Sequence, residues 1–514
     1  MGVYLKRLLT TGAAYQFGDI LAKAIALLTI PLYTRYVSRS EYGAANALLT
    51  AVILASIFLR LGVGEAFVRF YFDDDNAERR GRIARTTTST VAWTTTLASL
   101  VALALAGPLS RLILGFDDPI LMDCAILGLW AFTNLEVAYA QLRVDERART
   151  YVRASAANVL MTVAFTILLV VVGGQGARGL LLGNFAASAL VVLALWWVLR
   201  ERVSLWPLHN RAQLRDLAAM LRFGLPTVPA DASMYGLQVA DRLYLFRGFS
   251  HAAAGEYSVA VQFATVVLVL VRGFQYAWPP LAYSIQSDAD AARLYSLVAT
   301  YFALATGVMV TAVALLGRWI VRLLAAPEFF GAHVALPWLA LAWMLYGLYQ
   351  VQLVITGRAR ATARNLPAAL TGLGANVALL FLLVPDSGAG LGIAGAGIAL
   401  CGGYLAMLAA MHLLTRGLLE VRFEWRRLAL LAAILGAVAV SGELLLPTSG
   451  AAGLVLRLAW LALVPALLWL TRFFAPHERE RARALAADAA RRVASFRGKE
   501  GEVASHVDDP LRDA

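Results

Sequence analysis

This sequence is poor in the residues from which catalytic, redox and metal sites are built. Among 514 residues there are two cysteines and six histidines, and only 15% of the residues are charged. The histidines are scattered, and no phosphate-binding glycine loop, His/Cys metal cluster or nucleophile motif is present. Both cysteines, Cys124 and Cys401, fall in apolar runs, where a buried thiol is the expected state. These absences argue against an enzyme and against a bound cofactor or metal.

Long polar segments between the apolar runs are also missing. No stretch between apolar runs is long enough for a folded aqueous domain, and 60% of the residues are hydrophobic, with a mean hydropathy of +0.68. Apolar runs of about 20 residues recur along the chain, which is the length that a helix needs to cross a bilayer. The alternating pattern of a membrane β-barrel is absent. The sequence therefore predicts an all-α integral membrane protein.

The apolar runs predict about 14 transmembrane helices. Their approximate limits are 10–32, 44–68, 86–107, 119–140, 152–172, 178–199, 217–240, 254–278, 295–316, 331–355, 366–385, 391–413, 427–446 and 453–474. The start of the chain is interpreted as a permanent first span, because polar residues interrupt the run and no clear cleavage site follows it.

The net charge of +12 would suggest nucleic acid as the partner of a soluble protein. Here the basic residues lie mainly in short loops between spans, and no nucleic-acid-binding module is present. About 24 Lys and Arg fall on one side of the expected spans and about nine on the other. This asymmetry predicts that both termini are cytoplasmic and that the loops contact anionic lipid headgroups.

The chain contains a weak internal repeat with an offset near 211–218 residues. The matching stretches are 41–45 with 256–260, 157–159 with 375–377, and 110–112 with 321–323. Each half holds six spans, so the two halves enter the membrane from the same side and form parallel repeats, with a site expected between them. The expected units are residues 1–205 and 206–425 as two six-helix lobes, 426–475 as two extra helices, and 476–514 as a cytoplasmic tail. That tail is read as a short amphipathic helix followed by disorder.

Three basic residues lie inside apolar runs, where a charge near the bilayer centre costs about 2.5–3.5 kcal/mol. They are Lys23 in the first span, Arg60 in the second and Arg272 in the eighth. Two explanations fit each of them: the side chain lines a wet central cavity, or it reaches the membrane interface or a partner within the bundle. Cations facing one cavity would suit an anionic substrate, since arginine can fork onto a phosphate.

Acidic residues and prolines complete the candidate set. Glu136 and Asp231 are candidates for coupling to H⁺ or Na⁺, since carboxylates within a transport path can carry protons or bind cations. Pro226 and Pro229 lie close together in the expected seventh span, where they remove backbone donors and predict a kink or hinge. The alternative for the prolines is simple packing, because membrane helices tolerate proline.

Four stretches carry a family resemblance. They are PLYTRYVSRSEYG (31–43), LGVGEAFVRF (61–70), ADRLYL (240–245) and GEYSVA (255–260). Across about residues 5–475 the chain resembles the Wzx-type flippases of the multidrug/oligosaccharidyl-lipid/polysaccharide exporter superfamily.

The resemblance implies two six-helix lobes around a central cavity, working by alternating access. It implies that an undecaprenyl-diphosphate-linked oligosaccharide is moved from the cytoplasmic to the periplasmic leaflet. A polysaccharide polymerase and chain-length or export proteins are implied as partners. Lys23, Arg60 and Arg272 are similar in placement to cavity cations of related flippases of lipid-linked sugars.

Three alternatives stay open. A drug/cation antiporter of the same superfamily would share the lobes but should favour acidic residues in the cavity. A polymerase or ligase should show a large periplasmic loop, which is absent. A non-transporting scaffold of a polysaccharide-assembly complex would be insensitive to changes of the cavity cations. The sequence does not distinguish O-antigen, capsule and exopolysaccharide as the product.

Overall fold

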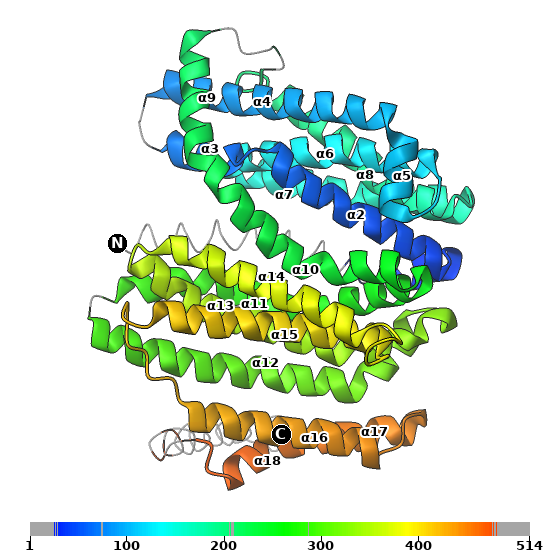
Figure 1. Ribbon diagram of the computed structural model, residues 1–514, viewed down its shortest axis with the longest axis vertical. Helices are drawn as coiled ribbons and strands as arrows, with labels where there is room; N and C mark the ends of the chain where they lie inside the picture. The colour runs from blue at the N-terminus through cyan, green and yellow to red at the C-terminus, as the bar shows by residue number, and fades with distance from the viewer. Residues whose placement is uncertain are drawn as a thin grey trace, which may run out of the picture.

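The computed structural model describes residues 29–72, 76–204, 210–285 and 287–474, with the single residues 25, 27, 206, 476, 478 and 480. Throughout these ranges the secondary structure is helical. Figure 1 shows the helices in three stacked layers: α2–α8 at the top, α10–α15 in the middle and α16–α18 at the bottom. We call the first two layers the first lobe and the second lobe, and the third layer the helix pair.

The first lobe consists of α2 (Arg39–Leu59), α3 (Val63–Tyr71), α4 (Ala77–Ala104), α5 (Ala106–Leu114), α6 (Pro119–Val144), α7 (Ala148–Thr166) with the π-helical turn η1 (Ile167–Val172), and α8 (Gly176–Val198). A linker follows, made of α9 (Arg211–Gly224) and the 3₁₀ turn η2 (Leu225–Thr227).

The second lobe consists of α10 (Val228–Gly248), α11 (His251–Ser284), α12 (Asp288–Leu324), η3 (Pro327–Val334), α13 (Leu336–Arg358), η4 (Thr362–Arg364), α14 (Asn365–Leu383) and α15 (Gly392–Thr415). The helix pair consists of α16 (Trp425–Leu445) and a second span broken into α17 (Gly450–Leu461) and α18 (Leu463–Leu470).

Helix starts follow from local capping chemistry. Ser38 and Glu41 form a reciprocal capping box at the start of α2, which satisfies backbone donors that the first turn leaves unpaired. Asp118 accepts a hydrogen bond from the backbone of Leu121 at the start of α6, where Pro119 occupies the first turn. These caps fix where the chain turns at the ends of the first lobe's helices.

Eleven helices among the described residues are long and apolar enough to cross a membrane, or 12 if the bent pair α4–α5 counts as one span. The sequence predicts about 14. Two of those expected spans are not among the 12: residues 10–32, most of which lie outside the described residues, and 217–240. In the second case the structure places α10 later, at Val228–Gly248, and its apolar character is interrupted by charged residues. Cys124 and Cys401 are both buried free thiols, as the sequence predicts.

Helices of the two lobes follow one another in a matching order. Arg39 and His251 begin the second helix of each expected half, Ala77 and Asp288 the third, and each sixth helix begins at a glycine after a tight turn. The match is not complete, because α4 and α5 are bent by 86° relative to each other where α12 is one uninterrupted helix of 37 residues. This order is what a duplicated six-helix unit would produce.

The expected second span, 44–68, is broken where the sequence predicts continuity. α2 ends at Leu59, Leu61 and Gly62 adopt positive φ angles of 52° and 68°, and α3 restarts at Val63. A Cβ atom on Gly62 would lie 2.0 Å from the carbonyl oxygen of Gly224. The backbone of the linker therefore packs directly on the backbone of this break, and only glycine, which has no side chain, leaves room for that contact.

The linker helix α9 is attached to the first lobe. Met220 is buried in a cluster with α3 and α4, Arg82 and Asp216 form an ion pair of 2.7 Å, and the Arg69 guanidinium lies 5.0 Å from the Phe223 ring centroid. Pro226 and Pro229 follow directly. The sequence predicts them inside one kinked span, but they lie at the junction of two helices, in η2 and in the first turn of α10.

The two ends of the bundle differ in charge, and we name them accordingly. The basic end holds the arginine-rich turns near residues 76–85, 143–153, 200–222, 358–364 and 416–427. The opposite end holds the turns near 35–39, 115–118, 173–178, 249–251 and 325–335. In Figure 1 the basic end is on the left and the opposite end on the right.

Candidate functional site

The two lobes meet in a tight seam at the opposite end. A Cβ atom on Gly43 of α2 would lie 2.5 Å from the His251 carbonyl oxygen, and one on Gly255 of α11 would lie 1.9 Å from that of Arg39. The Arg39 guanidinium forms an ion pair of 2.7 Å with Glu256 across the same line. Backbone contact at this distance holds the lobes together at this end.

Two further contacts extend the seam. The backbone N–H of Ala326 donates a hydrogen bond of 3.0 Å to the Thr34 hydroxyl. The Tyr42 and Phe329 rings meet edge to face, with centroids 5.9 Å apart. The seam therefore joins both helices and loops of the two lobes, so that opening it requires several contacts to break together.

At the basic end the structure brings two of the sequence-predicted site residues together. Arg60 is the C-terminal cap of α2, at the break, and its Nε donates to the Ser56 carbonyl oxygen at 3.4 Å. Asp231, in the first turn of α10, is exposed and lies within electrostatic range of Arg60 and Glu65. The residues come from both lobes, so this group of one cation and two carboxylates bridges the lobes where the linker crosses.

Arg272 lies elsewhere, in the middle of the long helix α11. Its side chain is half-buried, and its Nε is buried without a hydrogen-bond partner in the part of the chain that the structure describes. It is in electrostatic range of the buried Tyr404, whose ring lies 5.5 Å from that of Tyr346. Gln275, one turn on, donates to the Tyr346 hydroxyl at 3.0 Å. Among the described residues, the groups around Arg272 and those around Arg60 have no residue in common, so the structure does not gather these two cations in one cluster.

The remaining predicted residues have separate positions. Glu136 lies half-buried on α6 and forms no hydrogen bond or ion pair with the other described residues. Lys23 lies outside the described residues. A further charged pair, Asp241 and Arg242 of α10, is close to the lobe interface. Asp241 is 1% exposed, and it accepts hydrogen bonds from the Arg242 backbone at 2.8 Å and from the Tyr257 hydroxyl.

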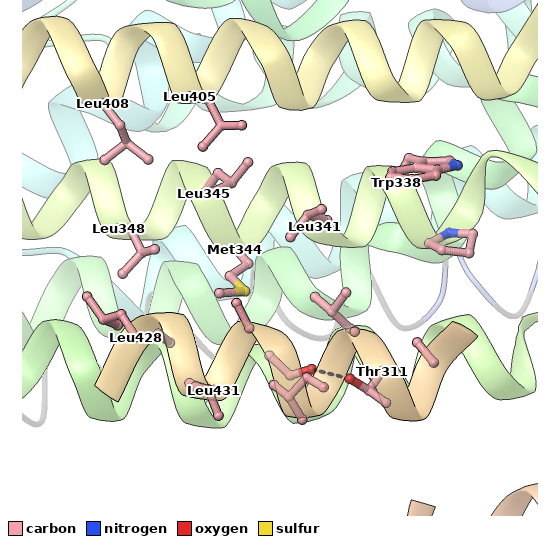
Figure 2. A pocket seen from close by; sticks show the side chains of 18 of the residues that line it. Thr311, Trp338, Leu341, Met344, Leu345, Leu348, Leu405, Leu408, Leu428 and Leu431 are labelled. Atoms are coloured by element: carbon pink, nitrogen blue, oxygen red, sulfur yellow. Dashed lines mark hydrogen bonds between the residues drawn. The ribbon is translucent and has the colours of Figure 1, made fainter. Parts of the chain in front are cut away.

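A long apolar groove of about 1070 Å³ runs between the second lobe and the helix pair (Figure 2). Its walls are α12, α13, α15 and α16. Figure 2 shows leucine side chains from α13, α15 and α16 pointing into the same space, with Met344 between them. The labelled apolar residues of the wall include Leu341, Met344, Leu345, Leu348, Leu405 and Leu408.

Charged groups stand at both ends of the groove. At the opposite end, Glu443 of α16 is held by Arg318 and by Arg457, the latter at 2.6 Å. His333 lines the same end; burial and nearby Arg318 lower the pKa of its imidazole. At the basic end the lining includes His412 and Arg416.

Sequence reasoning missed this charged cluster, although a signal was present. Arg457 lies within the last apolar run, and a buried arginine in a span needs a partner. Its side chain is 1% exposed, donates to three backbone carbonyls as well as to Glu443, and lies 5.2 Å from the Trp319 ring centroid. The cluster ties the helix pair to α12 and so fixes one wall of the groove.

We expect Arg457→Met to loosen the helix pair. The change leaves buried carbonyl groups without donors, at a cost of about 2–4 kcal/mol. Thermal unfolding of the purified protein in detergent should begin at a lower temperature than in the wild type. The matched control is Arg472→Met, at the exposed end of the same span. Equal unfolding temperatures for the two variants would contradict a structural role for Arg457.

Comparison with known proteins supplies a family and a fold. A family model described as "Polysaccharide biosynthesis protein" matches residues 9–286. No curated protein matches the chain. A solved structure of the lipid II flippase MurJ in an inward closed conformation is similar with a TM-score of 0.66. It is 12% identical, and the match covers 89% of this chain and 97% of that one.

Two transporters share the fold. An inward-facing multidrug resistance MATE family transporter of the MOP superfamily has a TM-score of 0.61 and 15% identity, over 78% of this chain and 95% of that one. A MOP superfamily transporter from Pyrococcus furiosus, described as having a binding pocket of reverse polarity, has a TM-score of 0.58 and 14% identity. The coverage is 82% of this chain and 96% of that one. At these identities the likeness concerns the fold, which is the MOP/MATE-like arrangement.

Proposed function

Because this chain belongs to the polysaccharide biosynthesis protein family, we propose that it is a flippase for a lipid-linked oligosaccharide. The cargo is an undecaprenyl-diphosphate-linked repeat unit, and the protein moves it from the cytoplasmic to the periplasmic leaflet of the bacterial inner membrane. The basic end faces the cytoplasm in this proposal, with both termini on that side. Transport rather than an enzymatic reaction is also what the fold shared with MurJ and the MATE transporter supports.

The apolar groove is the observation that supports a lipid-linked cargo most strongly. A water-soluble drug or cation would gain no favourable contacts from a groove of about 1070 Å³ that is lined by leucines along the height of the bundle. A polyprenyl tail would fit such a groove, because it must stay in apolar surroundings while its headgroup crosses the membrane. Leaving the bilayer for the groove changes the tail's hydrophobic environment little, so the groove guides the tail by shape and packing.

The polar half of the cargo needs a different environment. A diphosphate carries negative charge that is costly in hydrocarbon, and arginine side chains can fork onto its oxygens. We assign Arg60, at the break beside the linker, to the first encounter at the cytoplasmic side. Arg272 has a buried Nε without a partner among the described residues, and we assign it to binding the diphosphate at a later step, deeper in the membrane. Lys23 belongs to the same proposal from sequence placement alone.

Energy coupling and motion are assigned to neighbouring residues. Asp231 and Glu136 are the proposed sites of H⁺ or Na⁺ exchange, and Asp231 is placed where a change in its charge acts directly on Arg60. Pro226 and Pro229 are proposed as the hinge, because they separate the linker helix, which is attached to the first lobe, from α10. A polymerase and chain-length or export proteins are the proposed partners that take up the product.

Complementation of a deletion strain tests this proposal. We expect Arg60→Ala and Arg272→Ala to reach the membrane at normal levels but to lose surface polysaccharide, with lipid-linked repeat units accumulating inside. Arg60→Lys should retain part of the activity, since it keeps the charge but loses the fork. The control is Arg149→Ala, an exposed arginine at the basic end with no partner among the described residues.

The other outcomes are equally informative. Normal export by the alanine variants would mean that these arginines are structural. Normal export by the deletion strain, with no redundant flippase present, would reject the cargo itself. Drug efflux by the wild-type protein would then be the function to measure, since carboxylates lie beside Arg60.

A further inference from the structure

A second hollow, of about 640 Å³, lies at the opposite end of the bundle beside the seam. The first lobe forms most of it, from the start of α2, the α5–α6 turn and the start of α8. The second lobe contributes His251, the first residue of α11. The His251 ring stacks on Phe246 with centroids 4.3 Å apart and meets Phe116 of the first lobe edge to face at 5.7 Å. The hollow therefore spans the line along which the lobes would separate.

Polar side chains of the hollow are held in place by hydrogen bonds, but some of their oxygen and nitrogen atoms have no hydrogen-bond partner among the described residues. One oxygen of Asp118 accepts from the Leu121 backbone and from Arg178, each at 3.0 Å, and its other oxygen has no partner among the described residues. One oxygen of Glu41 is bound by Ser38, while the other points at the glycine that begins α8. These carboxylates are therefore oriented before any ligand arrives, which lowers the entropy cost of binding.

Gln175 and Arg178 add further unused groups. The Gln175 side chain is exposed and its amide bonds to none of the described residues, and Arg178 uses one of its amino groups for Asp118. The hollow thus offers acceptors and donors together: carboxylate oxygens, an amide, guanidinium N–H groups and an imidazole. Phe116, 37% exposed, adds a flat apolar face.

This mixture selects one kind of ligand. A diphosphate would be repelled by Glu41 and Asp118, and the one guanidinium that lines the hollow, that of Arg178, is already paired with Asp118. A metal ion would need acceptors alone and would be repelled by Arg178. A neutral sugar presents hydroxyl groups that donate and accept, and its ring has a C–H face that packs on an aromatic side chain. We propose that this hollow binds neutral sugar units of the oligosaccharide at the exit side, an inference that rests on the proposed function.

The position suits release. The hollow adjoins the seam: Ser40 and Glu41 line it, and the neighbouring Arg39 pairs with Glu256 across the lobes. A glycan that has passed between the parted lobes meets these first-lobe side chains next. Sugar bound there cannot return while the seam closes behind it, so the site favours movement in one direction. When the seam is open, His251 departs with the second lobe and the hollow loses one wall.

A cysteine reporter tests the site on the full-length protein. Ile120 lines the hollow and is 55% exposed, and the natural cysteines are both buried, so Ile120→Cys supplies a single reactive thiol. The probe is the oligosaccharide released by mild acid from the host's own lipid-linked pool, which lacks the diphosphate and the tail. We expect labelling by a maleimide to slow about threefold when the oligosaccharide is at about twice its Kd. Inorganic diphosphate should not protect.

Variants sharpen the result. Glu41→Gln combined with Gln175→Ala should abolish protection, whereas Asp386→Asn, in the corresponding turn of the second lobe, should leave it intact. Protection by diphosphate, or equal protection in the double variant, would overturn the proposal. Unprotected labelling together with normal complementation would reject this site while leaving the flippase function standing. Protection by sugar in a protein that moves no lipid-linked oligosaccharide would reject the proposed function, and with it the transport role of the site.

Discussion

Replacing Gly255 by leucine is expected to abolish export. Even the first carbon of a side chain would lie 1.9 Å from the Arg39 carbonyl oxygen. The Cβ atom is bonded to the backbone and the carbonyl oxygen belongs to the backbone, so neither atom can rotate away from the other. Overpacking of about 3 kcal/mol would lower the population of the closed seam roughly a hundredfold. Because alternating access requires this end to close, complementation of the deletion strain by Gly255→Leu should fail although the protein reaches the membrane.

Gly273→Leu is the matched control, on the same helix. A Cβ atom there meets nothing within 4 Å, so this variant should export normally. Cysteines at positions 39 and 256, whose side chains pair across the seam, test the same closure without added bulk. Oxidation should lock the seam and stop export, and a reductant should restore it. Normal export by Gly255→Leu would show that transport does not require the seam to close, and normal export by the oxidised cysteine pair would show that it does not require the seam to open.

Filling the apolar groove is expected to stop transport without harming the fold. Gly436 of α16 lines the groove, and a Cβ atom there would meet nothing within 4 Å. Gly436→Phe would place a ring in the path of a lipid tail, and replacing a mid-helix glycine should also stabilise α16 by a few tenths of a kcal/mol. Lipid-linked repeat units should accumulate on the cytoplasmic side, while the unfolding temperature stays equal or rises.

Ala433→Phe is the control for groove filling. It adds the same ring to the same helix at an exposed position that does not line the groove. The two variants should therefore differ in export and agree in membrane level. If Gly436→Phe exports as well as Ala433→Phe does, the groove plays no part in holding the cargo.

Local sequence properties account for most of what could be predicted. A span is recognised by its own hydropathy, and a basic loop by its own residues, so the helices and the charged end needed no knowledge of contacts. The burial of Cys124 and Cys401 was predictable for the same reason, because each lies in an apolar run. Arg60 was recognised for the same reason: a charge in an apolar run stands out wherever the helix is placed.

What could not be predicted depends on contacts between distant segments. The break at Arg60 exists because Gly62 and Gly224 cross, and neither glycine signals this alone. Asp231 comes within electrostatic range of Arg60 only because the linker carries α10 across to the first lobe. The groove escaped prediction because a leucine that faces lipid and one that lines a groove have the same hydropathy. Arg457 was visible, but its role follows only from Glu443 beside it.

A flipping assay in vesicles tests the central claim most directly. The purified protein is reconstituted with an undecaprenyl-diphosphate oligosaccharide that carries a fluorophore on its sugar, and an impermeant reductant quenches the outer leaflet. Vesicles without protein should lose about half of the signal, and vesicles with the protein nearly all of it. Vesicles that carry Gly436→Phe should behave like the empty ones. Quenching that stops at the same level with and without the wild-type protein, under an imposed H⁺ or Na⁺ gradient as well, would contradict the assignment of this chain as a flippase.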